Sequence, residues 1–252
     1  MGSPFMQVKQ IVNLFELLEL FIRAKQPLSV REIVDELGWA RSSTFNMVST
    51  LMELGYLYQP VTRGGYYPTS RWMDVARQLS EAQPLPESVH ELLVDLMKRT
   101  GETLVLAAPD GAEAVFLDVV ESPEVIRYTA SVGQRVPIQV TSVGRAILSQ
   151  YAPSERAALL KRISYHSYES GAYLTPEAVE ADIRQHQTNG WFLNRAHFVA
   201  GLAGVAVPFP FRNRRNAIVL GAPLARVEQR MDELGELLRD AVQEFLQRNG
   251  DL

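Results

Sequence analysis

The chain has 252 residues, of which 46% are hydrophobic and 21% charged, with a net charge of −4 and no cysteine. It is long enough for two globular domains, and the lack of cysteine excludes a disulfide scaffold, a thiolate metal site and a cysteine nucleophile. The net charge argues against a protein that coats nucleic acid, and no apolar run approaches the roughly 20 residues that span a bilayer. We expect a cytoplasmic protein without a membrane partner, and we interpret the opening letters MGSPF as a vector remnant.

Residues 8–25 predict an amphipathic helix with a wide apolar face. Its apolar side chains form two stripes at helical spacing. They are Ile11, Phe15, Leu18 and Ile22 in the first stripe, and Leu14, Leu17 and Phe21 in the second. A face this wide fits a helix that lies only in a core, and equally a helix that also meets another subunit.

Two short helices joined by a tight turn come next. Ser29, followed by Glu32 three residues later, predicts a capped helix start, and Gly38 predicts the end of that helix. Ser42 or Ser43 can cap the following helix. Short helices joined by a glycine-containing turn are typical of a helix-turn-helix.

β-Forming residues on both sides of Arg63-Gly64-Gly65 predict a hairpin tip, which makes residues 6–68 a winged helix-turn-helix. A linker helix is expected over 69–85, with Trp72, Val75, Ala76 and Leu79 on one face. The prolines in QPLPES mark the end of this helix and a domain boundary.

Residues 86–250 predict an α+β domain around one antiparallel sheet, because strands lie between helices. In chain order we expect a helix at 87–100, a hairpin of TLVLAA and AVFLDVV, a third strand in VIRYTAS, a helix within QVTSVGRAILSQY, helices from Pro153 and from Pro176 with Thr175 as its cap, strands near 202–209 and 216–221, and a helix near 226–247.

The second helix of the helix-turn-helix begins with residue types that contact DNA. In this motif the N-terminal residues of that helix meet base edges in the major groove. Arg41 provides a cation for phosphate, and Asn46 can form two hydrogen bonds with adenine. We therefore predict DNA binding through Arg41, Ser42, Ser43 and Asn46, with Arg63 on the wing. The alternative role of Ser42 and Ser43 is capping, which we expect of at least one of them.

Enzymatic and metal-binding motifs are missing from the sequence. It contains no G-x-S-x-G, G-x-x-x-x-G-K-[ST], G-x-G-x-x-G or H-E-x-x-H motif. The four histidines, which are His90, His166, His186 and His197, lack metal-ligand spacing. We expect no catalytic residue, no metal and no cofactor. Two segments have two possible interpretations each. The tip RNRRN is either a solvated turn or an anion site, and TSVGRA at 141–146 is either a capped helix start or an anion site.

Residues 8–248 resemble the IclR-type bacterial transcriptional regulators. The resemblance is carried by PLSVREIVDELGWARSSTFNMVSTLMELGYL, TGETLVLAAPDGAEAVFLDVVESP, SVGQRVPIQVTSVGRAIL and GLAGVAVPF, in the family's order and spacing. It implies a winged helix-turn-helix, a linker helix and a GAF-like effector-binding domain. It also implies dimers or tetramers on palindromic double-stranded operators, and no catalysis. Phe45 joins the expected DNA contacts, where the family often has histidine or tyrosine, and Asn46 stands where a second basic residue is usual.

The resemblance further implies a pocket for a small organic acid, formed by three segments and a nearby strand. The residues are Ser142, Val143 and Gly144, then Asn194, Leu202 and Gly204, then Val219 and Gly221, together with Tyr128. Asn194 stands where an acidic residue is common in the family. Val219 and Gly221 stand where some members have residues with a hydroxyl group. The apolar wall and the added room at Gly221 favour an acid with an aromatic or apolar body.

The function predicted from these features is DNA-binding transcriptional regulation that a small organic acid modulates. The alternative is a small-molecule sensor or enzyme whose N-terminal helical domain makes only protein contacts. Salt-sensitive binding to duplex DNA distinguishes the first from the second.

Overall fold

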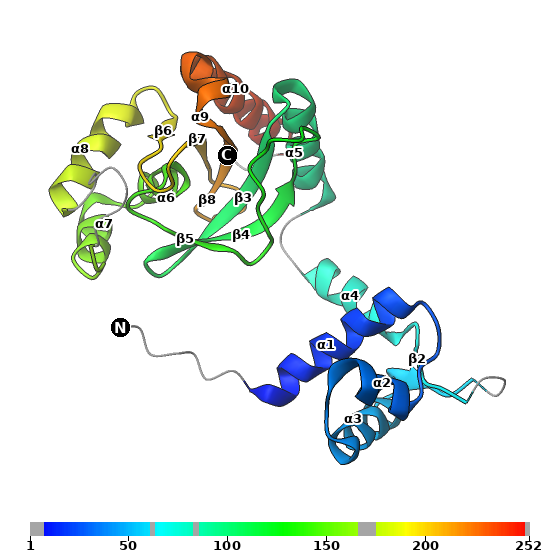
Figure 1. Cartoon of the computed structure of the whole chain (residues 1–252). Helices are drawn as coiled ribbons and strands as arrows, with labels where there is room; N and C mark the ends of the chain where they lie inside the picture. Colours follow the sequence, from blue (N-terminus) through cyan, green and yellow to red (C-terminus); the bar gives the residue numbers. More distant parts are fainter. Residues whose placement is uncertain (1–7, 61–63, 83–85, 166–174, 250–252) are drawn as a thin grey trace. The chain divides into compact units, whose positions relative to one another are not determined.

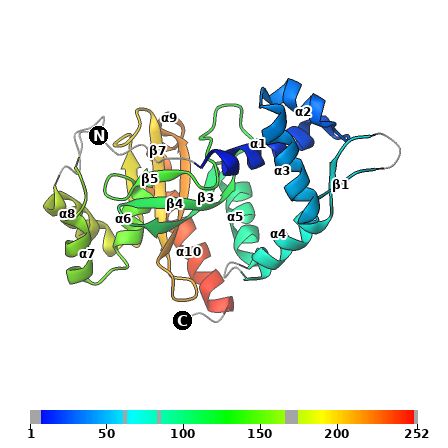
Figure 2. The same cartoon turned by 90° about the horizontal axis from the view of Figure 1, so that it is seen from below.

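The structure, a computed structural model, describes residues 8–60, 64–82, 86–165 and 175–249. The chain forms two compact units, residues 1–84 and 85–252. Helices dominate the first unit, and a six-stranded sheet with helices on both faces forms the second (Figures 1 and 2). No helix within these described ranges is long and apolar enough to cross a membrane.

The N-terminal unit is a helix-turn-helix with a two-stranded hairpin. Its elements are α1 (Lys9–Ala24), α2 (Val30–Leu37), α3 (Arg41–Glu53), β1 (Leu57–Tyr58), β2 (Tyr67–Pro68) and α4 (Arg71–Ala82). β1 and β2 pair antiparallel. Leu17, Ile33 and Val48, from the first three helices, are almost fully buried together. The indole N–H of Trp72 donates to the Tyr56 carbonyl at 3.0 Å, which joins α4 to this core.

The capping signals of the sequence differ in their outcome. The prediction for α2 is confirmed: the Glu32 N–H donates to the Ser29 hydroxyl, the Ser29 N–H donates to the Glu32 carboxylate, and Gly38 ends the helix at φ 68°. The prediction that Ser42 or Ser43 caps α3 is wrong. The helix starts at Arg41 with Ala40 as its N-cap, so both serines lie inside the first turn.

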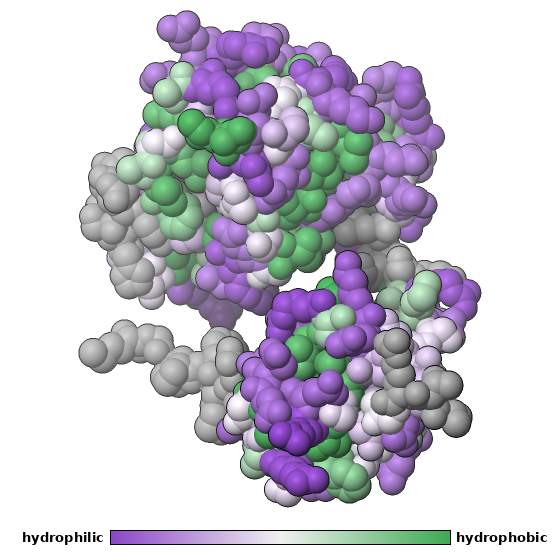
Figure 3. All heavy atoms as spheres, turned by 45° about the vertical axis from the view of Figure 1, so that its right-hand side comes forward, coloured by the Kyte–Doolittle hydropathy of each residue, from purple (hydrophilic) through white to green (hydrophobic). Residues whose placement is uncertain are grey.

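The wide apolar face of α1 divides into a buried half and an exposed half. Leu17 and Phe21 of the second stripe are buried, whereas Ile11, Phe15 and Ile22 of the first are 55%, 59% and 70% exposed. On the face shown in Figure 3, hydrophobic side chains reach the surface of this unit between hydrophilic ones. The core of the unit therefore uses only one of the two stripes.

The C-terminal unit is built on a single antiparallel sheet of order β5-β4-β3-β8-β7-β6. Its elements are α5 (Glu87–Thr100), β3 (Thr103–Asp110), β4 (Glu113–Val120), β5 (Arg135–Pro137), α6 (Ser142–Leu148), α7 (Pro153–Leu160), α8 (Pro176–Gln187), β6 (Phe192–Arg195), β7 (Leu202–Phe209), β8 (Asn216–Pro223), α9 (Leu224–Val227), the 3₁₀ helix η1 (Glu228–Arg230) and α10 (Met231–Asn249). The predicted α+β fold is confirmed.

Alternation along the central strands separates two hydrophobic cores. Leu104 and Leu106 of β3 face α5 and α10, which cover one side of the sheet. Val105 and Ala107 face the opposite side, where α6, α7 and α8 pack. The central strands are thus buried on both faces.

Three details of the predicted C-terminal unit are wrong. VIRYTAS is not a strand, because two of its backbone carbonyls accept hydrogen bonds from side chains instead of from a neighbouring strand. Thr103 donates to the Tyr128 carbonyl at 2.6 Å, and Arg226 donates to the Ile126 carbonyl at 2.8 Å. The strand at that edge is β5 instead. β6 was not predicted, and the last helix starts at Met231 after the short α9 and η1.

Candidate DNA-binding surface and effector cavity

The exposed face of α3 carries every predicted DNA contact of the recognition helix. Arg41, Ser42, Ser43, Phe45 and Asn46 are exposed. Thr44, Val48 and Leu51 point into the core on the other side of the same helix. The residues that hold the helix in place are therefore different from those that it presents to solvent.

The polar side chains on this face are free to bind a partner. Within the described part of the chain, no hydrogen bond or ion pair engages the side chains of Arg41, Ser42, Ser43 or Asn46. Together they offer a cation, two hydroxyls and an amide at the start of a helix. Such groups suit phosphates and base edges.

The wing is fixed to the helix-turn-helix by backbone hydrogen bonds. Leu28 and Tyr66 exchange N–H···O bonds of 3.0 and 2.8 Å. A Cβ on Gly65 would lie 2.9 Å from the Leu28 backbone, so only glycine allows this approach. Arg63, the predicted contact at the tip, lies outside the described residues.

A second candidate site lies between the sheet and the start of α6. The cavity has a volume of about 50 Å³. Its lining consists of Phe116, Tyr128, Val136, Thr141, Ser142, Val143, Asn194, Phe198, Leu202, Ala203, Gly204, Val219 and Gly221. All but one of the residues predicted for the effector pocket are brought together here, and the exception is Gly144.

Gly144 has a packing role that keeps it out of the cavity. A Cβ at this position would lie 2.0 Å from the Ile138 carbonyl oxygen, so α6 rests directly on the backbone at Ile138. The Gly144 N–H donates to the Thr141 hydroxyl at 3.2 Å. Gly144 is thus not among the residues that line the cavity, and Thr141 caps the start of α6 within TSVGRA.

The room expected at Gly221 is already filled. A Cβ on Gly221 would lie 2.3 Å from the Tyr128 ring, and a Cβ on Gly204 would lie 2.6 Å from the Ser142 hydroxyl oxygen. The missing side chains of these glycines make space for Tyr128 and Ser142. The expectation that Gly221 widens the cavity is corrected accordingly.

Most polar groups of the cavity wall are held by other protein groups. Asn194 donates to the Val140 carbonyl at 3.0 Å and accepts the His197 N–H at 2.9 Å. The Tyr128 hydroxyl, whose pKa is raised by burial, accepts a 3.3 Å bond from Gln134. Ser142 is different, because its side chain is buried and forms no hydrogen bond with any described residue.

Behind this wall lies a buried guanidinium, Arg145, which is 0% exposed. It forms an ion pair with Asp182 of α8 at 2.6 Å, and it donates to the Val140 carbonyl at 2.8 Å and to the Leu193 carbonyl. One side chain thus joins α6, α8, β6 and the loop that precedes α6. Apart from the position of Arg145 in TSVGRA, no local pattern predicts this role.

Two histidines near Arg145 respond to it and to Asp182 in different ways. A hydrogen bond to Asp182 raises the pKa of His186, although burial opposes this. Burial lowers the pKa of His197, with Arg145 as a second cause.

His90 pairs with Asp118 at 2.8 Å on the surface, and His166 lies outside the described residues. In the ranges that can be described, no cluster of acidic and histidine side chains is suited to a metal.

The cavity wall also contains residues outside the predicted set, which are Phe116, Val136, Thr141, Phe198 and Ala203. Phe116 lies on the same sheet face as Ala114, so strand alternation predicts its direction once the sheet order is known. The loop residue Phe198 gives no such periodic signal.

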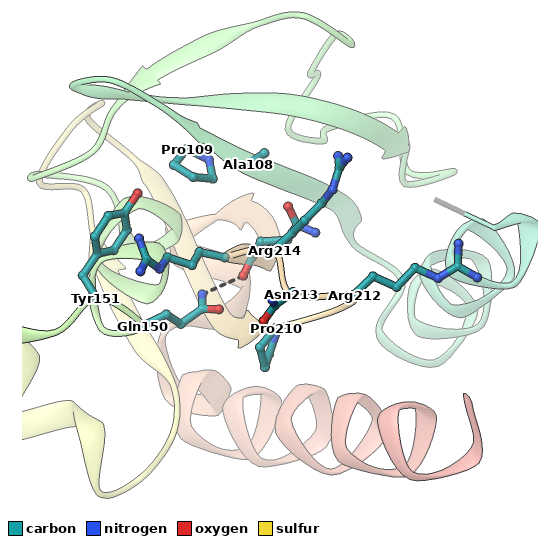
Figure 4. Close-up of a pocket in the computed structure, with 10 residues that line it drawn as sticks. Ala108, Pro109, Gln150, Tyr151, Pro210, Arg212, Asn213 and Arg214 are labelled. Carbon is teal, nitrogen blue, oxygen red and sulfur yellow. Dashed lines mark hydrogen bonds between the residues drawn. The ribbon is translucent and has the colours of Figure 1, made fainter. Parts of the chain in front are cut away.

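The arginine-rich tip between β7 and β8 borders a wide open hollow (Figure 4). Arg215 stacks on Tyr151 at 4.0 Å and pairs with Glu155 at 3.0 Å. Arg212 and Arg214 extend in different directions rather than toward one point. This geometry favours the solvated-turn interpretation over an anion site.

Comparisons with known proteins cover nearly the whole chain. The family models "IclR helix-turn-helix domain" and "Bacterial transcriptional regulator IclR C-terminal" match residues 10–60 and 78–246. The acetate operon repressor of Salmonella typhimurium is 25% identical over 243 residues, which cover 94% of this chain and 89% of the repressor.

Solved structures show the same fold. The Thermotoga maritima IclR has a TM-score of 0.72 at 22% identity, and the match covers 97% of this chain and all of that one. An IclR homolog from Microbacterium hydrocarbonoxydans, complexed with 4-hydroxybenzoate, has a TM-score of 0.64 at 19% identity, with 95% and 99% of the two chains covered.

Proposed function

The chain belongs to the IclR family of bacterial DNA-binding transcriptional regulators, not enzymes, and we propose that it binds a palindromic operator under the control of a small organic acid. The observation that carries the DNA-binding site is the exposed face of α3. Its polar side chains have no partner in the described part of the chain, although they stand at the start of the second helix of a helix-turn-helix.

The DNA contacts divide into two kinds in this proposal. Arg41 contacts phosphate, and Arg63 of the wing does the same. Asn46 reads a base edge in the major groove, where an amide pairs best with adenine. Ser42 and Ser43 are free for such contacts because neither of them caps the helix.

A homodimer or homotetramer is the second part of the proposal. It is supported by the exposed stripe of Ile11, Phe15 and Ile22, since the core of the N-terminal unit leaves these side chains in water. Leu79 on α4 is also exposed. Two-fold symmetry in the protein requires two half-sites separated by whole turns of DNA. Light scattering at micromolar concentration, with and without operator, should show no monomer.

For the effector we propose an acid with an aromatic or apolar body. The Ser142 hydroxyl supplies a buried donor without a partner, and the N–H groups of Ser142 and Val143 in the first turn of α6 are not used by the described residues. Phe116, Phe198 and Val219 supply an apolar wall. The relative from Microbacterium hydrocarbonoxydans that is complexed with 4-hydroxybenzoate supports the same chemical class.

An aromatic acid cannot enter without a change in the cavity. A cavity of about 50 Å³ has room for a few water molecules only. The Tyr128 ring, which packs on Gly221, occupies the adjoining space. We therefore propose that Tyr128 moves away from Gly221 when the effector binds.

The experiment uses the full-length chain in two steps. Selection from a random duplex pool yields the operator, and its affinity is then measured at several salt concentrations. Next, benzoate, 4-hydroxybenzoate, glyoxylate and gluconate are compared by thermal shift, with benzamide as an uncharged control. A ligand at a hundredfold its Kd adds roughly 2.7 kcal/mol to the free energy of unfolding.

Each step has its own contrary result. Failure to select any duplex, or turnover of a ligand without duplex binding, would contradict the regulator. Stabilisation by glyoxylate or gluconate but not by the aromatic acids would contradict only the effector class.

A further inference from the structure

Phe45 is a large apolar side chain on the exposed face of α3, near the start of the helix, and it is 53% exposed. Exposure alone means little, because Val125 and Met73 are more exposed. The position of Phe45 is what distinguishes it. It lies one helical turn after Arg41 and directly before Asn46, within the set of unpartnered polar side chains.

The surface around the Phe45 ring is hollowed. Val30 of α2 and Tyr66 of the wing line this hollow with Phe45, and Arg41, Ser42 and Asn46 complete it. An apolar area at the junction of α2, α3 and the wing is therefore bordered by hydrogen-bonding and charged groups. In a helix-turn-helix the N-terminal residues of the second helix, here those around Phe45, meet base edges in the major groove.

A phenyl ring has no donor or acceptor, so Phe45 cannot recognise the polar edge of any base. The apolar group that base edges display in the major groove is the 5-methyl group of thymine. Contact with Phe45 would remove both the methyl group and the exposed ring from water. Its neighbour Asn46 has the amide that pairs with adenine, so the two residues together suit a T- and A-containing step.

We propose that Phe45 is a specificity-determining residue that recognises the 5-methyl group of a thymine in each operator half-site. This inference rests on the proposed DNA-binding function. It adds a base-specific apolar contact to the hydrogen-bonding contacts of Ser42, Ser43 and Asn46.

The test removes the methyl group from the DNA and the ring from the protein, separately and together. Each thymine of the selected operator is replaced in turn by deoxyuridine, which differs from thymidine only by the methyl group. Affinities are measured for the full-length wild type, for Phe45→Ala and for Met52→Ala. Met52, 37% exposed near the other end of α3, is the matched control. Thermal melting checks that both variants are folded.

At one thymine of the half-site, we expect deoxyuridine to weaken wild-type binding about fourfold, the value of one buried methyl group. The same replacement should leave the affinity of Phe45→Ala unchanged and should weaken Met52→Ala as much as the wild type. If no thymine shows this dependence on Phe45, or if the selected half-site contains no thymine, the inference is wrong while operator binding stands. If the wild type selects no duplex at all, the proposed function itself fails.

Discussion

The two candidate sites of this chain use their polar side chains in opposite ways. On α3, the side chains of Arg41, Ser42 and Asn46 are exposed, and no described residue engages them. Around the cavity of the C-terminal unit, Asn194 and Tyr128 are already hydrogen-bonded to other protein groups. The buried Arg145, which pairs with Asp182, stabilises the segments that form the cavity wall.

This difference decides which properties can be separated by mutation. The opposite face of α3 holds it in the core through Val48 and Leu51, so its exposed groups can change without disturbing the fold. The cavity wall has no such division, because Asn194 faces the cavity and also anchors the loop at Val140. We expect substitutions on α3 to change binding, and substitutions at the cavity to change stability as well.

The largest expected effect is that of Arg145→Ala. Removing this guanidinium leaves the Asp182 carboxylate without its buried ion-pair partner, and it removes the hydrogen bonds of Arg145 to the Val140 and Leu193 carbonyls. Loss of one member of a buried pair costs about 3–5 kcal/mol of stability. Urea denaturation of the C-terminal unit measures it, with the exposed Arg184→Ala of α8 as control. Equal stability of the two variants would contradict the structural role of Arg145.

On α3, Asn46→Ala should leave stability unchanged and relax discrimination at one base pair per half-site, at a cost of about 1–3 kcal/mol there. Arg41→Ala should instead weaken binding to all duplexes and reduce the salt slope by about 1 per protomer. Affinities for the operator and its single-base variants at several salt concentrations separate the two. A uniform loss for Asn46→Ala would show that Asn46 does not read a base.

Ser142→Ala tests the exception within the cavity. Its buried hydroxyl has no partner among the described residues, so the substitution should not reduce the stability of the ligand-free protein. Binding of the acid effector should weaken by about 0.5–1.5 kcal/mol, the usual value of one hydrogen bond. Calorimetric titration with the acid found by thermal shift measures it. Unchanged affinity would remove Ser142 from the proposed effector site.

The sequence predicted those features that depend on interactions between residues close together in the chain, and it failed where the interacting residues are far apart. Ser29, Glu32 and Gly38 act within a few residues of one another, so the sequence was sufficient to predict both ends of α2. The failure at VIRYTAS has a distant cause, since Thr103 and Arg226 bond to its carbonyls from far along the chain. The position of Tyr128 against Gly221 is also a tertiary contact, and no local pattern encodes it.

The smallest expected effect concerns the pH dependence of the wall around Arg145. The pKa of His186 is raised above its ordinary value of 6.5, chiefly by the hydrogen bond to Asp182. Its protonated form therefore stabilises the folded state fully below pH 6.5, and this contribution is lost as the pH rises through the raised pKa.

His197 has the opposite sign, because burial lowers its pKa from 6.5. The unfolded chain then takes up the proton more readily, so stability is lost as the pH falls below 6.5 toward the lowered pKa. The melting temperature of the C-terminal unit, followed from acid to alkaline pH, separates the two histidines. The advantage of the wild type over His186→Gln should shrink as the pH rises, whereas its advantage over His197→Gln should grow, each change being below about 3 °C. Parallel pH profiles for the two variants would show that Asp182 and burial do not act on these histidines in opposite directions.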